Sequence, residues 1–511
     1  MKQNVFPEVD KAKLQFARSD ERIFDKRLET KPIGYFKDAW IRFRRNASSV
    51  TAAVIIILLM LFAIIVPFCT EYDVNFRDPY YACVLPRSKT LSKLGFWDGS
   101  KKMTVQSSGV DYYGALGLEC GAPAMREILS EPENGSGSYT IRFDTYNNVG
   151  FAFLNLSKAE YEALQAYQNS TGRQVLYPVP ATHKTNYVMG RGGANFWYKL
   201  ADESSTSNGA ALRDEKGDYI PNYLTSENKG KAGYDSLLIK GDDGGADGQS
   251  WYVYAVKNQT GYKVRVDYHE YFIYQKGFEP NFLFGTNNYG QDILTCLAIG
   301  ARLSFILAIC VSAINLTIGA IYGAVEGYYG GAVDIILERV SDILASVPFI
   351  VVATLFQLHL AHKVGVLPSL LFAFVLTGWV GMASTVRMQF YRFKRQEYIL
   401  AARTLGAKDW RLMFKHIFPN AIGTIITSSV LSIPGVIFSE SMLSYLGIVS
   451  FETSSLTSIG SMLANGQGYL YTYPHIILFP AVFIALLEIS FNLFGNGLRD
   501  AFNPALRGSE G

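Results

Sequence analysis

The chain is poor in the residues from which most catalytic and metal-binding sites are built. Its 511 residues include only 5 cysteines and 6 histidines, and the cysteines follow no metal-ligand spacing. The chain also lacks a phosphate-binding loop of the form GxxxxGKS or GxxxxGKT, so it cannot hold ATP by that device. We therefore expect this chain to bind no metal or cofactor and to have no ATPase activity of its own.

Charged residues are also scarce, at 18% of the chain against 49% hydrophobic residues, and the formal net charge is only +3. A balance this close to neutral gives no indication of nucleic-acid binding. The Lys and Arg side chains are instead concentrated beside long apolar segments. This distribution is typical of membrane proteins, whose basic loops stay on the cytoplasmic side, and it predicts contact with membrane lipid.

Six apolar segments without Lys or Arg are long enough to cross a bilayer as helices, which takes about 20 residues. Before the first segment, Phe36, Trp40 and Phe43 recur at helical spacing among basic residues, which predicts an interfacial helix. The predicted spans are Val50–Phe68, Leu303–Val325, Ile343–Ala361, Val364–Val386, Ala421–Ser439 and Ile476–Leu498.

These spans predict an α-helical protein that crosses the plasma membrane six times, with both termini in the cytoplasm. A polar stretch between the first two spans is long enough for an α+β domain, and long loops are translocated regardless of charge. We therefore expect an extracellular insert there. The expected parts are a cytoplasmic tail with the interfacial helix at 1–48, a first membrane helix at 49–69, the insert at 70–285, a core of five membrane helices at 286–500 with a cytoplasmic loop at 387–420, and a cytoplasmic tail at 501–511.

Local patterns in the insert predict both strands and helix. Runs rich in aromatic and β-branched residues at Ser138–Phe143, Trp251–Val256 and Tyr262–Tyr268 are typical of strands. The segment Leu156–Tyr167 is predicted to be a helix, because Ser157 is a suitable N-cap and a glutamate follows three residues later.

The insert offers little of what a catalytic or metal site needs. Cys83 and Cys120 could form a disulfide in an oxidising compartment or remain separate. The acidic stretch 241–249 lacks the ligand spacing and closing glutamate of a calcium loop, which favours a flexible loop. The insert has two histidines, His183 and His269, and neither a GxSxG nor an HExxH motif. A membrane-anchored enzyme or sensor is thus an alternative that these residues do not favour.

The stretch between the fourth and fifth spans is densely basic. From Arg387 to Lys415 it has eight Lys or Arg residues against two acids, Glu397 and Asp409. A short loop with that excess is expected in the cytoplasm. A plain basic stop-transfer loop would have the same charge, but it needs no particular order of small residues.

The order of small residues in this loop is specific. Ala401 and Ala402 are followed after three residues by Gly406, and Pro419 comes thirteen positions after the glycine. Small side chains let a partner surface approach closely, and a glycine permits a sharp turn between two short helices. The pattern resembles the coupling loop of binding-protein-dependent ABC importers, in which a glutamate precedes the two alanines. Leu400 occupies that glutamate position here, which is a departure from the family pattern.

Further motifs are similar to the C-type permease subunit of oligopeptide and dipeptide importers. The resemblance covers residues 33–80 and 283–508 and leaves out most of the insert, a loop that is usually short in this family. The segments that carry it are GTNNYGQD at 285–292, GYYGG at 327–331 with Asp334, Asp342 and Pro348, SYLG at 444–447 after Glu440, GSML at 460–463, and the stretch 491–500.

This resemblance implies a permease subunit of an ATP-driven importer that forms half of the path for a peptide. Its implied partners are a second, B-type permease subunit, two ABC ATPase subunits that bind ATP and Mg²⁺, and an extracellular solute-binding lipoprotein. Nickel or another small solute is the alternative cargo. An ion-coupled secondary transporter is a further alternative, but we find no inverted repeat in the sequence.

The resemblance also implies that the basic loop docks in a groove on an ATPase subunit, whose movement rocks the spans between two states. For Asp409, a local ion pair with Arg403 or Lys408 is the alternative role. The expected coupling residues are Glu397, Ala401, Ala402, Arg403, Gly406 and Asp409.

Polar side chains inside the membrane are costly and need partners or water. We expect four of them to line the path or to contact the partner permease, with helix-packing hydrogen bonds as the alternative, which we favour for the two asparagines. The four are Asn315, Glu440, Glu488 and Asn492. Pro348 and Pro434 lie within predicted spans and suggest kinks.

The insert is expected at the outer face, where a solute-binding lipoprotein delivers its cargo. Tyrosine side chains, which are frequent in the insert, supply contact area at low entropic cost and can still form hydrogen bonds. This leads to the hypothesis that the insert docks the lipoprotein or shields the delivery site. The alternative is a decoration with no role in transport.

Overall fold

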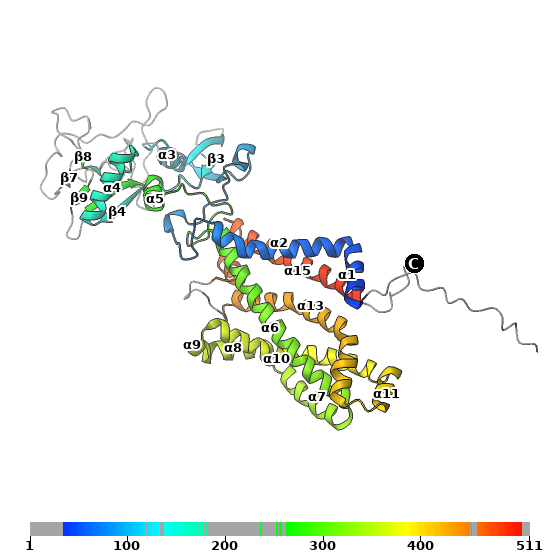
Figure 1. Cartoon of the computed structure of the whole chain (residues 1–511). Helices are drawn as coiled ribbons and strands as arrows, with labels where there is room; N and C mark the ends of the chain where they lie inside the picture. Colours follow the sequence, from blue (N-terminus) through cyan, green and yellow to red (C-terminus); the bar gives the residue numbers. More distant parts are fainter. Residues whose placement is uncertain are drawn as a thin grey trace, which may run out of the picture.

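The computed structural model describes residues 34–117, 120–132, 137–177, 262–449, 451 and 457–502, and four short strands between residues 179 and 257. The acidic stretch 241–249 lies outside these described residues. The described part is elongated: helices form the main body, an α+β region lies at one end, and the short helix α11 (Glu397–Thr404) lies at the other (Figure 1).

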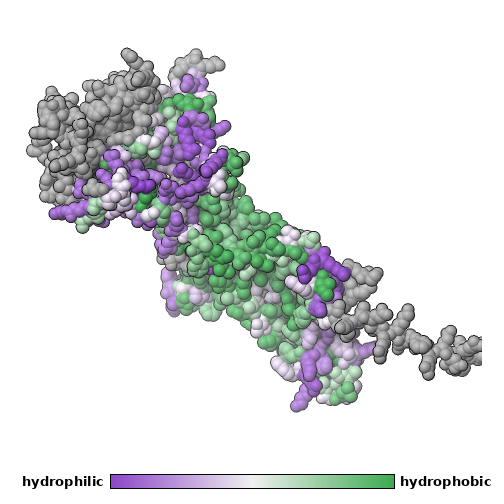
Figure 2. Space-filling view, turned by 45° about the horizontal axis from the view of Figure 1, so that its top comes forward, coloured by the Kyte–Doolittle hydropathy of each residue, from purple (hydrophilic) through white to green (hydrophobic). Residues whose placement is uncertain are grey.

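Among the described helices, five are long and apolar enough to cross a membrane. On the face shown in Figure 2, hydrophobic residues cover the middle of the molecule and hydrophilic residues gather towards both ends. This pattern is that of a helical membrane protein, as predicted. The five are α2 (Ala47–Cys69), α6 (Ile293–Tyr329), α10 (Val366–Phe393), α13 (Phe418–Tyr445) together with the helical turns that precede it, and α15 (His475–Phe502).

The third predicted span, 343–361, is not a single helix long enough to cross a membrane. α7 (Gly331–Ala345) ends three residues before Pro348, and α8 (Phe349–His359) has only 11 residues. The proline explains the break, because it has no N–H to donate and disfavours a helical conformation in the preceding residue. The kink expected at this proline is therefore a complete interruption.

Shorter helices connect the long ones. α9 (Ala361–Val364) follows α8, and α14 (Ile459–Gly466) lies between α13 and α15. The expected kink at Pro434 falls inside α13, which continues through the proline without interruption.

α6 and α10 pack closely along a row of glycines on α6. A Cβ atom at Gly323 would lie 2.2 Å from the carbonyl oxygen of Ala383. At Gly319 and Gly327 it would lie 2.7 Å from atoms of α10. Residues four apart share one face of a helix, and small residues on that face let membrane helices approach closely. The two helices therefore form a tightly fitted pair.

The helix predicted before the first span is present as α1 (Tyr35–Arg45), and it packs on α15. The ring of Phe43 is buried and meets the ring of Phe494 edge-on, with 5.4 Å between the centroids. Trp40 is 59% exposed, as expected for an aromatic side chain at a membrane interface.

The insert contains antiparallel sheets and short helices among its described residues, as expected for an α+β region. One sheet has the strand order β1–β3–β2, a second has the order β4–β10–β9–β7 with β5 also paired to β10, and β6 pairs with β8. The strands are β1 (Ser100–Gln106), β2 (Met125–Ser130), β3 (Ser138–Asp144), β4 (Phe151–Leu156), β5 (Leu176–Tyr177), β6 (Val179–Pro180), β7 (Ser236–Leu237), β8 (Tyr252–Val253), β9 (Ala255–Lys257) and β10 (Tyr262–Asp267), and the helices are α3 (Ser107–Ala115), α4 (Lys158–Thr171) and α5 (Tyr268–Lys276).

The local predictions for the insert are confirmed. The run 138–143 lies in β3, and the run 262–268 forms β10 except for Tyr268, which begins α5. The described residues of the run 251–256 lie in β8 and β9. α4 begins with the expected cap: the amide of Glu160 donates to the Ser157 hydroxyl at 3.3 Å, and the Glu160 carboxylate accepts from the Ser157 amide at 2.8 Å.

The chain enters and leaves the insert side by side, and these two segments are bonded together. The hydroxyl of Thr286 donates to the carbonyl of Tyr81 at 2.5 Å and accepts from the amide of Val84 at 2.8 Å. The ring of Phe284 stacks on Phe479 of α15, with 4.1 Å between the centroids. The insert is thus joined to the helical bundle by packed contacts as well as by the chain itself.

Candidate functional site

The basic loop folds as two short helices joined at Gly406. α11 ends two residues before this glycine, and α12 (Asp409–Arg411) begins three residues after it. Gly406 has a φ of +85°, a left-handed conformation that glycine adopts at little cost. A π-helical turn (Leu412–Ile417) then leads into α13. The expected glycine turn between two short helices is present.

Buried apolar side chains hold the loop against the helical bundle. Ile399 of α11 and Leu412 are fully buried and belong to one cluster with Phe390 of α10. Ala402 is half-buried against this cluster, whereas Ala401 is exposed. Of the two alanines predicted to dock a partner, only Ala401 therefore faces fully outward.

The loop exposes large apolar side chains that the sequence motif did not single out. Leu400 is 49% exposed, Leu405 is 87% exposed and Trp410 is 68% exposed. They recur every five positions in an otherwise basic loop, which was the available signal in the sequence. Burying a side chain of this size contributes about 1.5–3 kcal/mol. The glutamate position of the family motif thus has an exposed apolar side chain in this chain.

Arg403 and Asp409 meet on a residue of another helix. The hydroxyl of Tyr328, near the end of α6, donates to Oδ1 of Asp409 at 2.5 Å. The same hydroxyl accepts from Nη2 of Arg403 at 3.1 Å. The alternative role predicted for Asp409 is a local ion pair with Arg403 or Lys408. In the structure the hydroxyl of Tyr328 bridges Asp409 and Arg403.

A second polar cluster joins α10 to α7 beside the loop. The guanidinium of Arg387 donates to both carboxylate oxygens of Asp334, at 2.6 and 3.0 Å, and to those of Glu338, at 2.7 and 3.0 Å. Tyr391 also donates to Asp334, at 2.6 Å. The hydrogen bonds from Arg387 and Tyr391 hold the pKa of Asp334 below its ordinary value, so this carboxylate stays charged.

Comparison with known proteins identifies the family. Residues 315–508 match the model of the binding-protein-dependent transport system inner membrane component, and residues 34–86 match the N-terminal transmembrane domain of oligopeptide transport permease C. Over 224 residues the chain is 42% identical to the oligopeptide transport system permease protein OppC of Bacillus subtilis (strain 168), an alignment that covers 44% of this chain and 72% of that protein. The chain belongs to this family of ABC importer permeases.

A second relative of this permease is the dipeptide transport system permease protein DppC of Lactococcus lactis subsp. cremoris (strain MG1363). It is 37% identical over 227 residues, which are 44% of this chain and 64% of that protein. The crystal structure of an amino acid ABC transporter with histidines aligns with 39% of this chain and 91% of its own, at 15% identity and a TM-score of 0.31. Residues 87–314, which include most of the insert, lie between the two family matches.

Glu440 of α13 is fully buried within the permease itself. Its carboxylate accepts hydrogen bonds from the hydroxyls of Ser304 in α6, at 2.8 Å, and Ser444 in α13, at 3.0 Å. Burying a carboxylate is costly unless hydrogen bonds satisfy it. These contacts tie α13 to α6 and favour the packing alternative over a role in the path.

The other three membrane polar residues differ in their surroundings. Asn315 is buried between α6 and α10, and its Nδ2 atom would lie 2.4 Å from a Cβ atom at Gly378. Asn492 donates to the carbonyl of Glu488 at 2.9 Å, one turn earlier in its own helix. The Glu488 carboxylate is half-buried, and among the described residues its Oε1 atom has no hydrogen-bond partner. A contact with the path or the partner permease therefore stays a prediction for Glu488.

Cys83 and Cys120 do not form a disulfide in the structure. Cys83 packs against the hydrophobic core of the helical bundle, and burial raises the pKa of its thiol to about 11. The thiol of Cys120 donates to the carbonyl of Gly117 at 3.2 Å. The two side chains thus have separate surroundings, which explains why they are not bonded.

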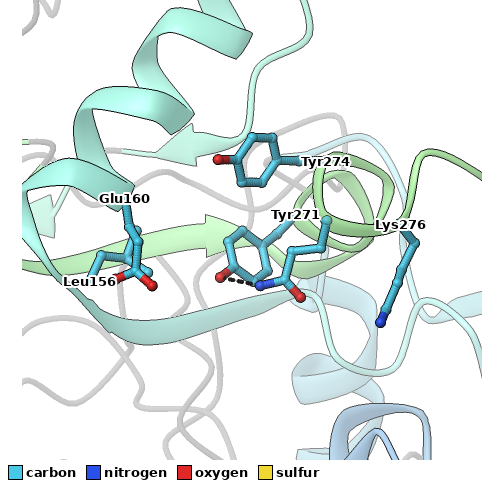
Figure 3. A pocket seen from close by; sticks show the side chains of 6 residues that line it. Leu156, Glu160, Tyr271, Tyr274 and Lys276 are labelled. Atoms are coloured by element: carbon cyan, nitrogen blue, oxygen red, sulfur yellow. Dashed lines mark hydrogen bonds between the residues drawn. The ribbon is translucent and has the colours of Figure 1, made fainter. Parts of the chain in front are cut away.

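The insert has a shallow groove of about 430 Å³ between α4 and α5. In Figure 3, Tyr271 and Tyr274 lie in the middle of the groove, with Glu160 on one side and Lys276 on the other. The Tyr271 hydroxyl accepts from the side chain of Gln275 at 2.6 Å. Aromatic faces between opposite charges can accept polar and apolar side chains of another protein.

Proposed function

We propose that this permease imports oligopeptides or dipeptides as one half of the translocation path of an ATP-driven importer. The names of its relatives, at 42% and 37% identity, support this cargo. In the proposed complex a B-type permease forms the other half of the path, and a solute-binding lipoprotein delivers the peptide. Two ATPase subunits bind ATP and Mg²⁺ and hydrolyse the ATP, and this chain is not itself an enzyme.

The observation that carries the ATP-driven function is the exposed face of the basic loop. Leu400, Leu405 and Trp410 present apolar surface there, and a monomer gains nothing from leaving three such side chains in water. The exposed Ala401 and Gly406 add no bulk beside them, so a partner groove can reach the backbone. We infer that an ATPase subunit covers this face.

We propose the following topology for the plasma membrane. The loop, with its excess of Lys and Arg, lies in the cytoplasm together with both termini. The described part of the insert lies at the opposite end of the molecule in Figure 1, which favours an extracellular position for the insert. The end of α7 and the short α8 together supply the third of six crossings.

Reconstitution tests this function. The permease, its B-type partner, the two ATPase subunits and the binding protein are placed in lipid vesicles, and ATP hydrolysis and uptake are measured together. We expect peptide-loaded binding protein to stimulate hydrolysis and labelled peptide to accumulate. Accumulation of nickel in place of peptide would identify nickel as the cargo. Uptake driven by an ion gradient without ATP would contradict the proposal of an ATP-driven importer.

We further propose that the insert docks the solute-binding lipoprotein or shields the delivery site. Two contacts hold it at the end of α15: the ammonium of Lys101 lies 4.0 Å from the ring centroid of Tyr473, and the rings of Trp97 and Phe479 are 5.9 Å apart. A protein bound to the insert would therefore be held over the end of the helical bundle. The groove beside Tyr271 is one surface for such a contact.

Replacements within the insert test the docking proposal, and the first of them leaves the contacts of Trp97 and Lys101 in place. β6 and β8 pair antiparallel, with Pro180 opposite Tyr252, so a short Gly/Ser loop in place of residues 181–251 closes a hairpin between them. A second variant replaces residues 90–260. We expect a higher half-maximal binding-protein concentration for stimulated ATP hydrolysis. Unchanged stimulation and half-maximal concentration in both variants would support a decoration without a transport role.

A further inference from the structure

We propose that Tyr328 is the positioning residue that fastens the basic loop to α6 and carries the loop's movement into the membrane helices. This inference rests on the proposed coupling of the loop to an ATPase. Tyr328 lies one residue before the end of α6, 75 positions from Arg403 and 81 positions from Asp409.

The geometry joins the two halves of the loop at a single atom. Arg403 lies on α11, before the turn at Gly406, and Asp409 lies on α12, after it. The hydroxyl of Tyr328 contacts both, as acceptor from Arg403 at 3.1 Å and as donor to Asp409 at 2.5 Å. The turn at Gly406 therefore cannot open without breaking at least one of these two hydrogen bonds.

The surroundings make these two bonds stronger than an exposed ion pair. Tyr328 is only 6% exposed, and its side chain belongs to the buried cluster beneath the loop. Its ring also lies beneath the guanidinium of Arg403, 5.7 Å from the ring centroid. Hydrogen bonds to charged groups contribute more than neutral ones, and partial burial removes competing water.

The tyrosine itself is fixed to the membrane helices. The preceding residue, Gly327, packs directly on the backbone of Arg387 in α10, and its carbonyl accepts from Nζ of Lys394 at 2.8 Å. Partial burial lowers the pKa of Lys394 from its ordinary value. Because α6 and α10 are closely fitted here, Tyr328 can move only together with this helix pair.

A pull on the loop thus reaches α6 through the tyrosine hydroxyl. The apolar contacts of Ile399 and Leu412 hold the loop near the bundle, but they are non-directional and allow it to slide. Two hydrogen bonds to one atom fix its orientation relative to the helix end. This division of roles explains why the loop has a polar anchor beside its apolar one.

The test compares Tyr328→Phe, which removes the hydroxyl and keeps the ring, with Tyr329→Phe. Tyr329 is the adjacent residue, is 52% exposed and meets the ring of Tyr328 edge-on, so it is a matched control. In the reconstituted importer we expect Tyr328→Phe to lower the number of peptides transported per ATP by about fivefold. The control is expected to leave this ratio and the recovery of the complex unchanged.

A second readout does not depend on the cargo. Amide hydrogen exchange of residues 397–411 in the purified complex should be about tenfold faster in Tyr328→Phe and in Asp409→Ala, but not in Tyr329→Phe. The double variant Tyr328→Phe/Asp409→Ala should be no faster than Tyr328→Phe alone, because Tyr328→Phe already removes the hydroxyl that bonds to Asp409.

The outcomes separate this inference from the proposed function. Unchanged exchange in Tyr328→Phe would overturn the fastening role, and faster exchange with an unchanged transport ratio would overturn the transmission of movement. If the wild-type complex imported no peptide, the proposed function would fail, while the exchange rates would still decide whether Tyr328 positions the loop.

Discussion

At the scale of the residue, Gly406 shows that space and backbone conformation are separate requirements. Its φ of +85° is one that side chains other than glycine rarely adopt, yet a Cβ atom there would meet no atom within 4 Å. A larger residue would fit into the space and would still strain the turn. The cost of a substitution therefore depends on how well the new residue tolerates the left-handed conformation.

This argument predicts a difference between two replacements of Gly406. Gly406→Val should abolish most peptide uptake. A β-branched residue in this conformation costs at least about 1–2 kcal/mol, and it adds bulk to the exposed face of the basic loop. Gly406→Asn should retain more uptake, since asparagine tolerates the left-handed region. Uptake of labelled peptide is compared at equal membrane levels. Equal loss in both variants would mean that bulk, and not conformation, decides.

Glu440 allows a prediction about stability, because it is surrounded by hydroxyl groups of the same chain. Glu440→Leu should destabilise the permease by roughly 2–5 kcal/mol, since the buried hydroxyls of Ser304 and Ser444 lose their acceptor. Glu440→Gln keeps an acceptor and should cost less. The unfolding temperature in detergent measures the effect, with Ser439→Ala on the same helix as the control. Normal stability with lost uptake would point to a role in the path instead.

At the scale of the element, the close fit of α6 and α10 depends on residues without side chains. Gly323→Ala should destabilise the permease by about 1–3 kcal/mol, because the new methyl group would lie 2.2 Å from the Ala383 carbonyl oxygen and force the helices apart. Gly381→Ala is the control, since a Cβ atom at that position on α10 meets nothing within 4 Å. Thermal unfolding of the two purified variants makes the comparison. Equal stability would show that the helix pair can relax.

The elements that the sequence predicted are those determined by apolar length and local capping. α2 follows from an uncharged run, α15 follows from an apolar run whose one charged residue is Glu488, and α4 follows from the Ser157–Glu160 capping box. α6 begins at Ile293, ten residues before the predicted start, because the charge of Arg302 interrupts the apolar run without interrupting the helix. At Pro348 the sequence indicated a bend, but the choice between a bend and a break depends on tertiary packing.

The candidate site was predicted only in part, for a similar reason. The spacing of Ala401 and Gly406 identified the loop, and it correctly indicated a turn between short helices. Nothing in the local pattern could identify Tyr328 as the partner of Asp409, because the two are 81 positions apart and meet only when α6 packs beneath the loop. Periodicity reports the faces of single helices, not the contacts between distant ones.

At the scale of the whole molecule, the proposed topology can be tested by chemical labelling. In a variant without the five native cysteines, single cysteines are introduced at Lys93 in the insert and at Lys408 in the loop, which are both exposed. We expect an impermeant thiol reagent to label the first in intact cells and the second only after permeabilisation, because basic loops stay inside. Labelling of the loop site in intact cells would overturn the topology.

The length of α6 has a mechanical consequence. It is one uninterrupted helix of 37 residues, capped by Asp292 next to the base of the insert and ending beside the basic loop. At 1.5 Å per residue the helix is roughly 55 Å long, so a tilt of about 10° around its midpoint displaces each end by roughly 5 Å. A stiff rod of this length amplifies small rotations. A slight change of the angle of α6 is thus enough to shift the base of the insert by more than the width of a water molecule.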